Sequence, residues 1–220
     1  MSRLAKLRLQ ARRLRRDASG VAMLEFAFAA PIFFALVMGG LEVANLALTH
    51  MRVSNIAMTV ADNAGRKTSG IDEANVYEVF AGADVIGDSI GFHDNGRLVL
   101  SSIEHNGRNG GRAGQTVVWQ RCWGDLEFDP MYAEQGDGDN DSSLADGVGA
   151  DGHKIMALPG TAVMFVEATY DYQPLVGSGW FKSPRIRYES AFNVRGRINN
   201  DLTNTQDLDQ LVCSDEEEEE

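Results

Sequence analysis

The stretch GVAMLEFAFAAPIFFALVMGGL, residues 20–41, carries one charged side chain, Glu25. An α-helix rises about 1.5 Å per residue, so these residues would span a hydrocarbon core of about 30 Å. Seven of the chain's 20 basic residues lie before this stretch, within residues 1–16. Because basic flanks stay in the cytoplasm, the sequence predicts a single membrane span with its N-terminus inside and the rest of the chain exported.

Simpler targeting signals explain part of this pattern. Ala27 and Ala29 resemble the small residues of a secretory cleavage site, but the strongest apolar residues follow that site. The arginine pairs at 12–13 and 15–16 do not lead into a twin-arginine pattern. A plain signal anchor stays open and explains everything except Glu25, because a carboxylate in an apolar helix costs a few kcal/mol and usually has a partner.

A cut after Gly20 would supply that partner. Val21 would become the N-terminus, and Glu25 would be its fifth residue, one helical turn away. The new α-amino group and the carboxylate carry opposite charges in one low-dielectric layer, so they neutralise each other within one subunit or between neighbours.

The order Gly20, four residues, Glu25-Phe26 and then Pro31 resembles the start of the membrane helix in the TadE-like family of tight-adherence pilus assembly proteins. More broadly, it resembles a type IV prepilin processing site. The resemblance implies a pilin-like, non-enzymatic component of a pilus or secretion assembly, with no cofactor. Its partners would be a prepilin peptidase that cuts before Val21, other pilin-like subunits that pack against the helix, and membrane lipid. It also implies the bacterial inner membrane, a periplasmic C-terminal domain and, as one outcome, incorporation in a surface pilus.

Looser similarities to TadE-like and TadG-like proteins follow at residues 119–122 and 166–175 and in a final strand that ends at Arg195. The insert between Phe128 and Leu158 departs from that pattern, and the subtype within the family stays open. The alternative function is an uncleaved, membrane-anchored periplasmic domain that recruits a partner or ligand. A membrane-tethered hydrolase has no support, because the sequence shows no nucleotide loop, nucleophile elbow or CxxC motif.

The apolar pattern continues beyond the predicted span at three- and four-residue spacing, which is typical of an amphipathic helix. One helix is therefore expected from about Val21 to Ala64, with its first half in lipid and its second half packed on a soluble domain. Pro31 favours a kink, and Gly39-Gly40 allows another helix to approach closely.

The remaining pattern predicts a weak helix or loop at residues 72–90 and then strands, which together indicate an α+β fold with an antiparallel, pilin-like sheet. A glycine-rich turn at residues 106–114 makes a hairpin of the first two strands, and a Gly177–Gly179 turn separates the last two. The expected strands are Leu98–Glu104, Gln115–Arg121, Ala162–Tyr172 and Ile186–Arg195. The expected domains are a cytoplasmic leader at 1–20, a transmembrane helix at 21–48, a periplasmic head at 49–213 and an acidic tail at 214–220.

Charge and cysteine content constrain the partners and the compartment. From residue 21 onward the chain holds 13 basic and 31 acidic residues, so this part would repel nucleic acid. Cys122 and Cys213 are expected to form a disulfide if the head lies outside the cytoplasm. Closing a loop of that length would stabilise the fold by about 4 kcal/mol in the chain-entropy model.

Metal sites have weak support. Asp137, Asp139 and Asp141 alternate in a flexible stretch and are a calcium candidate. An EF-hand that began at Asp137 would need glycine and glutamate where Ser142 and Val148 stand, so a solvated acidic loop is the preferred interpretation. The four histidines show no metal-binding spacing.

Overall fold

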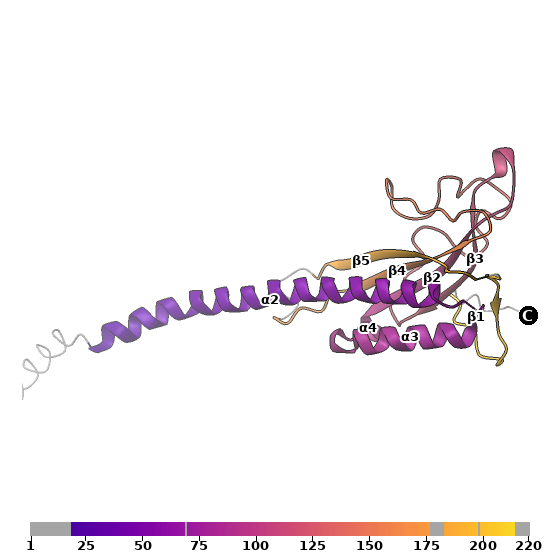
Figure 1. Cartoon of the computed structure of the whole chain (residues 1–220). Coiled ribbons are helices and arrows are strands. Elements are labelled where there is room, and N and C mark those ends of the chain that lie inside the picture. Colours follow the sequence, from indigo (N-terminus) through magenta and orange to yellow (C-terminus); the bar gives the residue numbers. More distant parts are fainter. Residues whose placement is uncertain (1–18, 69, 177–182, 198, 214–220) are drawn as a thin grey trace, which may run out of the picture. The chain divides into compact units, whose positions relative to one another are not determined.

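The computed structural model describes residues 19–68, 70–176, 183–197 and 199–213 (Figure 1). The chain divides into two compact units, residues 1–45 and 46–220. The predicted Gly177–Gly179 turn, the acidic tail and nearly all of the leader lie outside the described residues. The antiparallel sheet and the helices around it confirm the α+β fold class.

The longest element is the helix α2, Ser19–Gly65, which agrees with the predicted helix to within two residues at each end. Pro31 lies inside α2. The buried apolar stripe of α2 begins at Val53, since the earlier apolar residues Val43 and Ala47 are exposed, although the polar residues Glu42 and Thr49 before it are also buried. From there, six residues at helical spacing are almost fully buried: Val53, Ile56, Ala57, Val60, Ala61 and Ala64.

Most of residues 72–90, where the sequence predicted a weak helix or loop, form a regular helix, α3 Glu73–Gly87. Its first turn is fixed by Asp72, whose side chain accepts a hydrogen bond from Ala74 N at 3.1 Å, while Asn75 returns one to the Asp72 backbone N–H. This reciprocal cap satisfies backbone donors that a helix start leaves unpaired. The helices after α2 are α3 Glu73–Gly87, the 3₁₀ turn η1 Asp88–Ile90, α4 Phe92–Asn95 and the 3₁₀ turn η2 Gly110–Arg112.

All four predicted strands are present and form one antiparallel sheet in the order β3-β2-β4-β5. The predicted hairpin is β2-β3, and its register shifts between Ser102 and Ile103. A separate two-stranded parallel sheet, which the sequence did not predict, joins β1 to β6. The strands are β1 Ile71–Asp72, β2 Gly96–His105, β3 Gln115–Trp123, β4 Ala162–Asp171, β5 Arg185–Asn193 and β6 Leu202–Thr203.

One face of the sheet packs against helices. Phe80 of α3 and Ile56 of α2 belong to the same buried cluster as Leu100 and Tyr170 of the sheet. Stacked aromatic rings extend this cluster, since Phe92 lies 5.7 Å from Tyr170 and 6.2 Å from Trp123, centroid to centroid. The periodic apolar residues of α2 and α3 therefore pack against the same face of the sheet.

The opposite face is covered by the long insert, which we define as residues 124–161. Ile103, Val117, Val163 and Phe165 of the strands form a second buried cluster with Ala133, Leu144, Val148 and Ala157 of the insert. Within residues 124–161, all of them described, the only β pairing is an isolated bridge between Val148 and Ile155. The insert is therefore a packed layer without regular secondary structure.

The backbone of the insert approaches the backbone of β3 closely at Gly138. Gly138 has φ +75°, and a Cβ atom there would lie 2.0 Å from the carbonyl oxygen of Gln115. Gln115 N donates to Leu144 O at 3.0 Å, and its side-chain oxygen accepts from Ala157 N at 2.8 Å. Only glycine fits at position 138, because any side chain would displace the insert from β3.

The C-terminal segment, residues 202–213, is fastened to the head at several points. The predicted disulfide Cys122–Cys213 is formed. Arg121, beside it on β3, donates to both carboxylate oxygens of Glu73 in a pair that is almost fully buried, and also to Gln210 Oε1 at 3.1 Å. These contacts join α3, β3 and the C-terminal segment.

We expect the double variant C122S/C213S to lose about 4 kcal/mol of unfolding free energy, because the bridge closes a 91-residue separation and restricts the unfolded chain. Denaturant unfolding of the full chain in detergent, with and without reductant, measures this loss. Reductant should lower the midpoint of the wild type and leave that of the variant unchanged. Equal midpoints for wild type and variant under oxidising conditions would contradict the prediction.

Candidate functional site

The first unit presents an almost unbroken apolar surface. Along residues 21–41 of α2, large side chains are exposed to an extent that is unusual for a water-soluble helix, with Met23 at 79%, Phe26 at 71% and Phe28 at 72%. Within the described residues, α2 is the one helix that is long and apolar enough to cross a membrane. This finding agrees with the predicted span.

Glu25 interrupts this apolar surface. Its side chain is exposed, and it forms no ion pair or hydrogen bond with any residue that the structure describes. The same helix places Glu25 one turn after Val21, as the sequence predicted from their spacing. Among the described residues, Glu25 therefore has no partner.

Three of the glycines of α2 have no packing role among the residues that the structure describes. A Cβ atom built at Gly20, Gly39 or Gly40 would meet nothing within 4 Å. Glycine in a helix is less favourable than alanine by about 1 kcal/mol. The folded chain itself therefore does not require glycine at these three positions.

The acidic stretch of the insert does not form a cation cage. Asp137 accepts a hydrogen bond from Glu134 N at 2.9 Å, and Asp141 accepts one from Ser143 N at 2.8 Å. Asp139 lies 3.9 Å from the guanidinium of Arg108. Among the described residues, these three carboxylates do not converge on a common point. They stabilise their own loop, as expected for a solvated acidic stretch.

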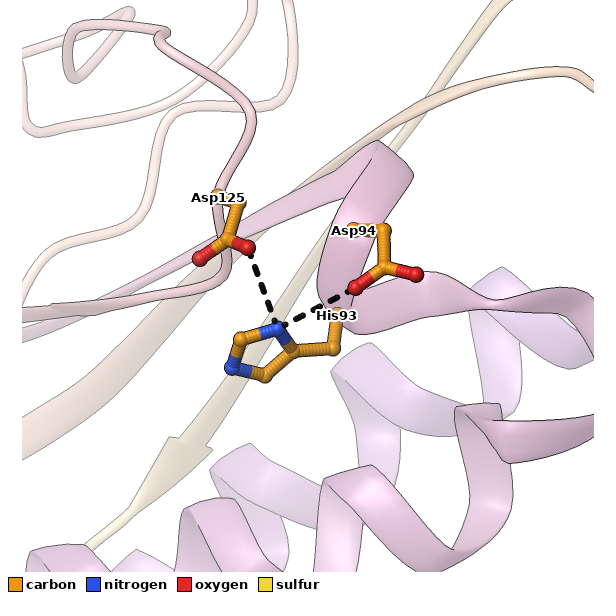
Figure 2. Close-up of side chains that lie close together, drawn as sticks. All are labelled: His93, Asp94 and Asp125. Atoms are coloured by element: carbon orange, nitrogen blue, oxygen red, sulfur yellow. Dashed lines mark ion pairs between the residues drawn. The ribbon is translucent and has the colours of Figure 1, made fainter.

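The structure brings together one group that the sequence spacing did not reveal. Figure 2 shows the ring of His93, from α4, directed between the carboxylates of Asp94 and Asp125. His93 Nδ1 lies 3.6 Å from Asp94 Oδ1 and 3.5 Å from Asp125 Oδ2. Trp123 contacts the His93 ring edge to face, and Asp125 N donates to His93 O at 2.8 Å.

These three residues offer ligand types that suit a divalent cation, and one ligand atom of each lies within 4.8 Å of the others. All three side chains are nevertheless exposed, with Asp94 at 80%. Exposed carboxylates beside a histidine also form ordinary surface ion pairs. Sequence spacing could not reveal this group, because Asp125 follows His93 by 32 positions and reaches it through the β2-β3 hairpin.

The most perturbed acid of the head is Glu167, on β4 beneath the insert. Its side chain is 5% exposed, and its Oε2 atom accepts a hydrogen bond from Met131 N at 2.9 Å. Glu189 lies directly opposite on β5. Burial raises the pKa of Glu167 to about 7, and the charge of Glu189 adds to the rise, while the hydrogen bond from Met131 opposes it.

This pKa predicts how the stability of the head depends on pH. The folded protein holds the Glu167 proton more tightly than the unfolded chain does, so stability is lost as the pH rises from about 4.5 to about 7. Glu167→Gln keeps an acceptor for Met131 N and removes the titration. We expect E167Q to be more stable than the wild type at pH 8, by at most about 3 kcal/mol, and to lose that advantage at pH 4.

Thermal unfolding of the full chain in detergent at the two pH values measures this difference. Glu127→Gln, at an exposed position of the insert, is the matched control and should leave the pH dependence unchanged. An E167Q variant whose stability relative to wild type is the same at both pH values would contradict the assignment.

Comparison with known proteins bears on the first helix alone. The family model described as TadE-like protein matches residues 20–62, which include Gly20, Glu25, Phe26 and Pro31. No curated protein and no solved structure matches the chain. The matched residues begin at the glycine of the predicted cut and extend almost to the end of α2. Over these residues, the resemblance of this chain to the TadE-like family is confirmed.

Proposed function

We propose that this protein is a pilin-like component of a tight-adherence pilus assembly or secretion system, processed by a prepilin peptidase. The observation that carries this proposal is the family match, which starts at Gly20 and includes Glu25 within an exposed apolar helix. The protein acts through assembly rather than catalysis, in keeping with the structural role of TadE-like proteins.

The peptidase would cut between Gly20 and Val21. Gly20 has no described neighbour within 4 Å that would exclude a side chain, so a requirement for glycine here would come from outside the fold. Recognition by a protease that needs access to the backbone would impose such a requirement, because glycine allows the closest approach to a scissile peptide bond.

The cut would give Glu25 its partner. It creates an α-amino group at Val21, and a cation in the lipid layer is stabilised by a nearby carboxylate. The exposed position of Glu25 favours pairing with a neighbouring subunit, whose helix would pack along the same apolar surface. Gly39 and Gly40 would allow that helix to approach closely.

In this proposal α2 spans the bacterial inner membrane, and the head lies in the periplasm. Two observations support the orientation. The basic residues precede the helix, and the positive-inside rule keeps them in the cytoplasm. The head carries the Cys122–Cys213 disulfide, which forms and persists in an oxidising compartment.

Processing is tested by the intact mass and N-terminal sequence of the protein extracted from the membranes of its native host. We expect a mature chain that begins at Val21. Gly20→Val should retain residues 1–20, because a branched side chain blocks access to the bond. A host without its prepilin peptidase should give the same unprocessed chain.

Two other N-termini would lead to different conclusions. A wild-type chain that keeps its basic leader would favour the alternative, an anchored periplasmic recruitment domain. A chain that begins at Ala30 would identify an ordinary secretory signal and remove the basis for assembly through the helix.

The role of Glu25 is tested separately from cleavage. Glu25→Gln removes the charge that faces the new N-terminus, so we expect the variant to be depleted from high-mass membrane complexes. Glu25→Asp, which keeps a carboxylate at the same position, is the matched control and should assemble more nearly like the wild type. Separation of detergent extracts by size, with quantification of the protein in each fraction, distinguishes the two. Equal incorporation of E25Q and wild type would contradict the pairing role.

A further inference from the structure

The two edges of the four-stranded sheet differ in how their backbone groups are used. At the β3 edge, Val117 N donates to Asp137 O and Val117 O accepts from Gly136 N. Further along, Gln120 N donates to the Gln135 side chain, and Cys122 N donates to Leu211 O. The insert and the C-terminal segment therefore close the β3 edge.

The β5 edge is open over most of its length. Val194 N donates to Ala162 O at 2.9 Å, and Tyr172 N donates to Pro184 O at 3.2 Å. These bonds fix the alternation along the strand, so that even-numbered residues of β5 direct their backbone groups toward β4 and odd-numbered residues direct theirs outward. The outward groups belong to Arg185, Arg187, Glu189, Ala191 and Asn193.

Within the part of the chain that the structure describes, the covered part of this edge is its far end. Arg195 N, beyond the strand, donates to Gly65 O of α2 at 3.2 Å. Among the described residues, none forms a hydrogen bond with the backbone N–H or C=O of Arg185, Arg187, Glu189 or Ala191. Four successive outward residues thus present unpaired donors and acceptors at intervals that match another strand.

Charged side chains on an edge strand usually prevent pairing with another strand. On β5, however, the positive Arg187 is followed two residues later by the negative Glu189, so two antiparallel copies of this strand can place opposite charges against each other. The side chains of Arg187 and Glu189 lie on the insert-facing side of the sheet and are held there. The Arg187 guanidinium lies 4.9 Å from the centre of the Phe128 ring, and Glu189 Oε2 accepts from Ala150 N at 3.3 Å. Little side-chain freedom remains to be lost on association.

The outward backbone groups limit the registers in which β5 can pair with β5 of a second copy in antiparallel orientation. If Tyr188 lies on the two-fold axis, Arg187 of each copy faces Glu189 of the other, and both outward N–H and C=O groups of these residues are paired. A shift to the neighbouring allowed registers would place Arg187 opposite Arg187 or Glu189 opposite Glu189. Like charges directly opposite are unfavourable, so one register is selected.

We propose that β5 is a self-association edge, at which two copies of this protein join their sheets through antiparallel β5–β5 pairing centred on Tyr188. The interface is isologous and closes after two copies, which is the commonest symmetry of homo-oligomers. It uses the head and is independent of any helix contact in the membrane and of cleavage after Gly20.

The test is a charge exchange measured by sedimentation equilibrium of the full chain in density-matched detergent micelles, over a series of protein-to-detergent ratios. The wild type should dimerise. R187E and E189R each place two like-charge pairs in the interface and should weaken the dimer by about tenfold or more. The double variant R187E/E189R restores both opposite-charge pairs and should return the dissociation constant close to that of the wild type.

Two further variants distinguish the loss of β5–β5 pairing from a general loss of stability in the head. Arg185→Gln also removes a guanidinium from the Phe128 ring and from its ion pair with Asp171, but residue 185 faces Ala191 of the second copy, so dimerisation should persist. Ala191→Pro removes an outward N–H without breaking the β4-β5 ladder and should abolish the dimer while each head stays folded. Thermal unfolding of every variant verifies the folded state.

A monomeric wild type overturns the proposal. So does a folded A191P variant that dimerises normally, because it would place the contact elsewhere, for example on the membrane helix. A folded double variant that is as weak as either single variant refutes the register centred on Tyr188.

Discussion

Burial of β4 on both faces is the constraint on which the head depends. Nine of its ten residues are buried, from Ala162 to Tyr170, so neither face of this strand tolerates water. Antiparallel sheets often leave one face solvated, and then a single layer of helices suffices. Here the sheet needs two layers, which α2 and α3 provide on one side and the insert provides on the other.

The irregular insert follows from the same constraint. It has almost no regular secondary structure of its own, so its backbone groups must find partners elsewhere. Many bond to β3, where residues 136, 137 and 144 pair with the strand edge. The insert thus covers an apolar face and closes the β3 edge at once, and among the described residues the edge of the four-stranded sheet that remains open is that of β5.

Helix α2 combines two environments in one continuous element. Up to about residue 41 its large side chains are exposed on every side, whereas from Val53 to Ala64 a narrow stripe is buried. An all-round apolar surface suits lipid or neighbouring helices, and a stripe suits one face of a sheet. Glu25, Gly20, Gly39 and Gly40 have no partner or packing role among the described residues, and the proposed function would give each of them a role in processing or assembly.

The sequence by itself determined every element that periodicity encodes: α2, the four strands of the main sheet, the β2-β3 hairpin and the α+β class. Each depends on local spacing of apolar residues, which can be read without knowing what they contact. The motif from Gly20 to Pro31, which carries the resemblance to the TadE-like family, was also readable, because its members lie on one helix within a few turns. The cysteine pair was predicted from the presence of two cysteines and from the compartment expected for the head. Only the tertiary structure showed that the insert covers the second face of the sheet and that β1 pairs with β6. It also decided the grouping of His93 with two aspartates and the environment of Glu167. All of these join segments that lie far apart in the chain, and single-sequence patterns carry no information about which distant segments meet.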